Sequence, residues 1–70
     1  MIRNQIVTVF KHFADHPENQ KNGSPDWSFV EADVMMLFGV DRLIEELGSL
    51  EQFYVLFNDL VDAYLLSEAA

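Results

Sequence analysis

Seventy residues with a mass of 8.1 kDa form a single domain over residues 1–70, because domains usually contain about 100 to 150 residues. This length excludes a multidomain enzyme, and a hydrophobic content of 50% excludes a disordered chain. Twelve Asp and Glu against four Lys and Arg give a net charge of -8, which disfavours direct binding to nucleic acid or to an acidic membrane surface.

Cysteine is absent from the sequence, which removes disulfides, thiolate metal sites and a cysteine nucleophile. The first residues lack the basic and then apolar layout of a signal peptide, and no apolar run approaches the roughly 20 residues that span a bilayer. We therefore expect a cytoplasmic protein that does not enter membranes. A core this small supplies only about 3 to 5 kcal/mol without disulfides, so oligomerisation would be a natural supplement.

The first predicted element is an amphipathic helix from Gln5 to Asp15. Its apolar residues recur at helical spacing: Ile6, Val9, Phe10 and Phe13, with Val7 and Ala14 widening the stripe. Residues 6–9 are rich in β-branched side chains and could form a strand, but the helical period continues through Phe13. Pro17 disfavours helical angles at the residue before it, so the helix should end near Asp15.

Residues 17–26 are polar and contain the turn signals Asn22-Gly23 and Ser24-Pro25, which predict a long loop that is mobile or binds a ligand. Either Ser24 or Ser28 could cap the next helix, and both choices include residues 29–38 in it. All of those ten residues except Glu31 and Asp33 are apolar. A helix that is apolar on every side lies at the centre of a fold or meets another chain.

Gly39 should end the second helix, and Asp41 is a plausible N-cap for a short helix over residues 42–47. A capping box at residues 49–52 then opens the last helix. The apolar stripe of that helix extends over four turns: Leu50, Phe53, Tyr54, Phe57, Leu60, Val61, Tyr64 and Leu65. These elements predict an all-α fold, a small bundle of three principal helices plus one short helix.

Two groups of residues could carry chemistry, and for both we favour a structural role. His12 and His16 have the spacing of metal ligands on one helix, but they are better explained as exposed histidines at a helix C-terminus. Asp33 could be a buried catalytic carboxylate, or it could pair with Arg3, Lys11, Arg42 or a tyrosine. No catalytic, phosphate-binding or cofactor motif accompanies them, so we expect a protein that is not an enzyme and binds no metal or cofactor.

The acidic surplus predicts a surface that binds a basic protein. We expect eight residues of the two last helices to form it: Asp41, Glu45, Glu46, Glu51, Val55, Asp59, Asp62 and Leu66. An inhibitor, an immunity factor or an adaptor would have such a surface, and it could compete for the nucleic-acid site of a DNA- or RNA-binding protein. The competing interpretation is an acidic face that only keeps a small domain in solution.

A second hypothesis is a regulatory dimer with a degenerate helix-turn-helix over residues 33–47. Its recognition helix would present one arginine and three acidic residues to DNA, which argues against this function. Independently of function, three helices have too few layers to bury every apolar residue of the second helix. We therefore expect a homodimer with four residues at the interface: Val34, Met35, Leu37 and Phe38.

Overall fold

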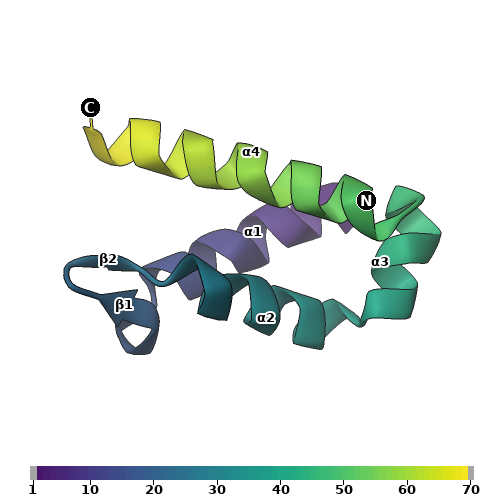
Figure 1. The fold of residues 1–70 in the computed structure, drawn as a ribbon, viewed down its shortest axis with the longest axis horizontal. Helices are drawn as coiled ribbons and strands as arrows, with labels where there is room; N and C mark the ends of the chain where they lie inside the picture. The colour runs from purple at the N-terminus through teal and green to yellow at the C-terminus, as the bar shows by residue number, and fades with distance from the viewer. Residues whose placement is uncertain (1, 70) are drawn as a thin grey trace.

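The computed structural model describes the backbone of residues 2–69 and the side chains of residues 2–67. Its helices are α1 (Ile2–Asp15), α2 (Trp27–Phe38), α3 (Val40–Leu47) and α4 (Leu50–Ala69). Between α1 and α2 lie a 3-10 turn, η1 (Pro17–Asn19), and two short strands, β1 (Gln20–Lys21) and β2 (Ser24–Pro25). The predicted all-α fold is confirmed, with three principal helices and one short helix, and it includes one small antiparallel hairpin (Figure 1).

The helices α2 and α4 extend along the length of the molecule, and α1 crosses behind them (Figure 1). The short helix α3 connects α2 to α4 at one end. The closest backbone packing joins α1 to α2 and α3 to α4, whereas the backbones of α2 and α4 approach each other much less. One side of the α2–α4 pair is therefore covered by α1, while no further helix of the described chain covers the other side.

The side chain of Phe10 joins three helices. Its ring stacks on Trp27 of α2 with 5.7 Å between ring centroids, and it meets Phe57 and Tyr64 of α4 edge to face at 5.3 and 6.3 Å. Trp27 and Tyr64 also contact each other, at 5.4 Å. Such aromatic pairs contribute beyond their buried area, so this cluster fixes the positions of α1, α2 and α4 relative to one another.

The core draws on every helix. Its buried members are Ile2, Ile6, Phe10 and Ala14 of α1, Val30 and Val34 of α2, Leu43 and Leu47 of α3, and Phe53 and Phe57 of α4. The four residues of α1 are spaced four apart, which places them on one side of the helix. Three predicted stripe residues are instead exposed: Val7, Tyr54 and Leu65. They lie at the edges of their helical stripes, beyond the reach of the neighbouring helices.

The helix starts differ from the predicted ones. The side chain of Asp26 caps α2 by accepting a hydrogen bond from the backbone N–H of Ser28, so neither Ser24 nor Ser28 is the cap. Helix α3 begins at Val40, directly after Gly39, and Asp41 lies in its first turn instead of capping it. At α4 the prediction is confirmed, because the Ser49 hydroxyl accepts from the N–H of Gln52 at 3.2 Å.

Residues 17–26, predicted as a long loop, contain the turn η1 and the hairpin β1–β2, and the predicted turn signal Asn22-Gly23 lies between the two strands. Asn22 and Gly23 both adopt positive φ values, 54° and 85°, as a two-residue type I′ turn requires. This turn pairs Lys21 with Ser24 and Gln20 with Pro25. The backbone N–H of Asp26 donates to the carbonyl of Asn19 at 2.7 Å, which closes the segment on itself.

We predict that Phe10→Ala lowers the free energy of unfolding by about 3 to 5 kcal/mol, because it removes the ring that three helices share. A chain of this length has roughly 4 to 10 kcal/mol in total, so the substitution should remove a large share of the stability. Urea unfolding followed by Trp27 fluorescence measures the effect. Val55→Ala, at an exposed position, is the control and should change stability by less than about 0.5 kcal/mol.

Candidate functional site

All eight residues of the predicted partner-binding surface lie exposed on the molecule. Three belong to α3 and five to α4: Asp41, Glu45 and Glu46, then Glu51, Val55, Asp59, Asp62 and Leu66. We call these residues the acidic surface. Within α4, residues 55, 59, 62 and 66 are separated by four, three and four positions, so they form one stripe along the helix. This stripe lies opposite the buried residues Phe53 and Phe57.

Apolar side chains are part of this stripe. Val55 is 55% exposed and Leu66 is 73% exposed, and the carboxylates of Asp59 and Asp62 lie between them along the helix. Protein interfaces combine apolar contact area with charged groups at the rim. The stripe combines apolar and charged side chains in the same way, over about three turns of α4.

Charge is unevenly divided along the chain. Residues 26–70 contain ten of the twelve Asp and Glu and one of the four Lys and Arg. The single cation of that segment is Arg42, whose Nε lies 3.2 Å from a carboxylate oxygen of Glu46. Its guanidinium also lies 5.7 Å from the centre of the Phe38 ring. The helices α2 and α4 consequently carry acidic residues and no Lys or Arg.

The same contacts bear on the helix-turn-helix interpretation. Helices α2 and α3 do follow each other around Gly39. However, the arginine that would approach DNA is engaged with Glu46, and Asp41 and Glu45 are exposed on the same short helix. A recognition helix needs cations to approach the phosphates, and Arg42 is the one cation of α3.

Asp33 has a partner that the sequence did not suggest. Its carboxylate accepts a hydrogen bond from the side-chain amide of Asn19 at 3.2 Å, instead of pairing with a cation or a tyrosine. The same amide donates to the backbone carbonyl of Phe13 at 3.0 Å. Asn19 therefore ties the hairpin segment to both α1 and α2, and Asp33 has a structural partner.

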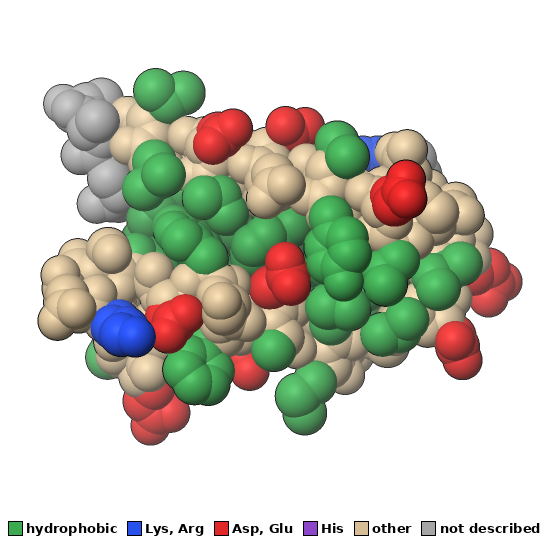
Figure 2. Space-filling model, viewed as in Figure 1, with side chains coloured by type: hydrophobic (Ala, Val, Ile, Leu, Met, Phe, Trp, Pro, Cys, Tyr) green, Lys and Arg blue, Asp and Glu red, His purple; other side chains and the backbone are tan. Residues whose placement is uncertain are grey.

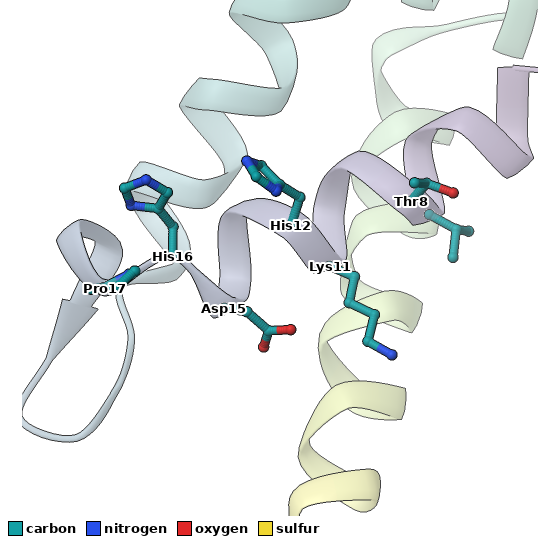
Figure 3. A pocket seen from close by; sticks show the side chains of 7 residues that line it. Thr8, Lys11, His12, Asp15, His16 and Pro17 are labelled. Atoms are coloured by element: carbon teal, nitrogen blue, oxygen red, sulfur yellow. The ribbon is translucent and has the colours of Figure 1, made fainter.

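The two histidines lie beside a shallow depression of about 540 Å³ on the outer side of α1. Figure 3 shows both imidazoles on one side of the helix and the side chains of Lys11 and Asp15 on the other. The rings of His12 and His16 are 6.1 Å apart. His16 Nδ1 accepts a hydrogen bond from the N–H of Glu18 and caps η1. Among the described residues, no three His, Cys, Asp or Glu side chains come together as metal ligands.

The predicted dimer-interface residues have different environments. Val34 has no exposed surface and lies in the core, so its assignment to an interface is corrected. Met35 and Phe38 are half-buried, and Leu37 is 60% exposed. Two further apolar residues of α2, which we did not predict, are exposed: Phe29 at 61% and Met36 at 82%.

Helical spacing identifies these residues in retrospect. Phe29, Ala32 and Met36 are separated by three and four positions and share one side of α2, and Leu37 lies in a second row that runs from Phe29 through Asp33. That side is opposite Val30 and Val34. We call these four residues the outer face of α2. Knowing which side is buried fixes the opposite side, but a helix with apolar residues all round does not reveal this from its sequence.

No known family pattern, curated protein or solved structure matches the chain. Within residues 2–69, none of the helices is long and apolar enough to cross a membrane.

We predict that Asn19→Ala lowers the free energy of unfolding by about 1 to 3 kcal/mol, because two hydrogen bonds are lost and the Asp33 carboxylate loses its donor. Urea unfolding of the purified variant measures this change. Asn58→Ala removes the same group from an exposed position in α4 and should shift stability by no more than about 0.5 kcal/mol. Equal effects of the two substitutions would contradict the role of Asn19.

Proposed function

We propose that the protein is a non-enzymatic binding module whose acidic surface docks on a basic protein. The observation that carries this proposal is the separation of charge: ten acidic residues follow residue 25, and the one cation among them is paired with Glu46. A surface of one sign attracts a partner of the opposite sign and speeds its association. An inhibitor, an immunity factor or an adaptor would use it in this way.

The apolar residues of the stripe support a specific contact. Coulomb attraction at an exposed surface is weak in salt, so affinity requires some buried apolar area as well. Val55 and Leu66 offer that area next to Asp59 and Asp62. A basic protein that normally binds DNA or RNA is one form of partner, since exposed carboxylates carry the same sign as phosphates.

We expect Asp62→Asn to weaken capture of the partner from a lysate of the source cells, whereas Glu18→Gln should not. Both substitutions remove one charge from an exposed side chain, but only Asp62 lies in the acidic surface. Immobilised variants, with captured proteins quantified by mass spectrometry, give the comparison. Capture by the wild type should also fall as salt rises from about 50 to 300 mM, because the Debye length shortens.

Equal losses for the two variants would show that net charge alone drives capture. Capture that does not change with salt would contradict an electrostatic partner. A captured protein without a basic surface would contradict the proposal in the same way.

We further propose that the chain forms a two-fold homodimer through the outer face of α2. Phe29, Met36 and Leu37 are each at least 60% exposed, and no charged residue occupies the row that runs from Phe29 through Ala32 to Met36. A contiguous apolar surface of this kind on a small domain marks a contact site. Two copies of an uncharged row can meet without bringing like charges together.

Leu37→Asp is expected to convert the dimer to a species of 8.1 kDa, since burying an unpaired carboxylate at a contact is costly. Light scattering at high micromolar concentration measures the mass. Asp59 belongs to the acidic surface on α4 and not to the outer face of α2, so Asp59→Asn should leave the dimer intact. A wild-type mass of 8.1 kDa at that concentration would contradict the homodimer.

A further inference from the structure

A second apolar area lies on the side of the molecule that α1 does not cover. Figure 2 shows hydrophobic side chains gathered between α4 and α2 on this side, with an acidic side chain among them. Trp27 and Met35 of α2 border it, and Tyr54, Val61 and Leu65 of α4 border it from the other helix. We call these five residues the α2–α4 face. Tyr54 and Leu65 are 38% and 47% exposed, and the other three are half-buried.

A charged residue lies in the middle of the α2 side of this face. Trp27, Glu31 and Met35 are separated by four positions each, so Glu31 lies in one row between two apolar residues. Its side chain is half-buried, and it makes no hydrogen bond or ion pair with any residue in the described part of the chain. This environment differs from that of Asp33, the other acidic residue of α2, which accepts from Asn19.

The surrounding charges define what can cover Glu31. Neither α2 nor α4 contains Lys or Arg. Of the two cations nearest to Glu31 in sequence, Lys21 lies on β1, and Arg42 on α3 is paired with Glu46. A second copy of the chain placed here would oppose Glu31 to an equivalent row that also lacks a cation, and both copies carry a charge of -8. A cation from another protein would instead neutralise this carboxylate in a partly desolvated position.

We infer that the α2–α4 face binds a basic amphipathic helix of a partner protein, with a Lys or Arg of that helix opposite Glu31. The apolar side of an amphipathic helix can pack on an apolar surface that two roughly aligned helices share. The twelve residues of α2 correspond to about 18 Å at 1.5 Å per residue, so three turns of the partner would match its length. This inference uses a face separate from the acidic surface, and each can fail alone.

A synthetic peptide tests the inference directly. The probe is a Trp-free amphipathic helix of about four turns with leucines along one side, one lysine at the centre of that side and lysines on its flanks. Trp27 is the single tryptophan of the chain and belongs to the α2–α4 face, so its emission reports binding without a label. We expect a saturable change in this emission, and an affinity about tenfold lower for Glu31→Gln than for the wild type.

A second peptide, with glutamine in place of the central lysine, tests the same ion pair without changing the protein. It should bind the wild type about tenfold more weakly, and it should bind Glu31→Gln with little further loss, because both changes remove the same ion pair. Glu18→Gln is the matched control, since it also removes one charge from an exposed side chain but lies in η1, outside both the α2–α4 face and the acidic surface. Its affinity for the lysine peptide should stay within about twofold of the wild type.

Three results would overturn the inference. The first is absence of a saturable emission change, and the second is an equal loss of affinity for Glu31→Gln and Glu18→Gln, which would mean general charge attraction. The third is a wild-type dimer in light scattering that Leu65→Ser dissociates and Leu37→Asp does not, because a second copy would then occupy this face. Capture of a basic protein through the acidic surface is measured separately, so failure here leaves that result unaffected.

Discussion

The contacts of Phe10 determine the arrangement of the bundle. One ring on α1 meets Trp27 of α2 and both Phe57 and Tyr64 of α4, so α1 packs against the two other long helices from one side. The hydroxyl of Tyr64 also donates to Asp15 at 2.8 Å, at the C-terminal end of α1. With α1 fixed behind them, α2 and α4 share only part of their apolar surface, and their other sides face away from the core.

Because α2 is apolar on nearly every side, some of its apolar residues lie outside the core. Its residues Val30 and Val34 lie in the core, and Trp27, Met35 and Phe38 pack partly against it. The large apolar residues Phe29, Met36 and Leu37 are exposed. Two different surfaces result. The outer face includes the uncharged row from Phe29 through Ala32 to Met36, and Asp33 beside that row is hydrogen-bonded to Asn19. The α2–α4 face instead contains Glu31, which has no such donor within the described residues.

Charge is unevenly divided between the first 25 residues and the helices that follow. The first 25 residues are close to neutral overall, while the later helices carry the acidic surplus and place it on α3 and on the side of α4 opposite Phe53. Asp26, Glu31 and Asp33 are exceptions, because they belong to α2 or its cap and are half-buried. The acidic surface is thus composed of residues with no role in packing, which leaves them available for a partner.

Local patterns in the sequence were sufficient for several features: the end of α1 at Asp15 before Pro17, the break at Gly39, the Ser49 cap and the exposed stripe of α4. Each depends on residues within one or two turns of one another. The Asn19–Asp33 contact and the burial of Val34 were decided by the tertiary structure. These features depend on which side of a uniformly apolar helix meets α1, and helical periodicity carries no information about that choice when every side is apolar.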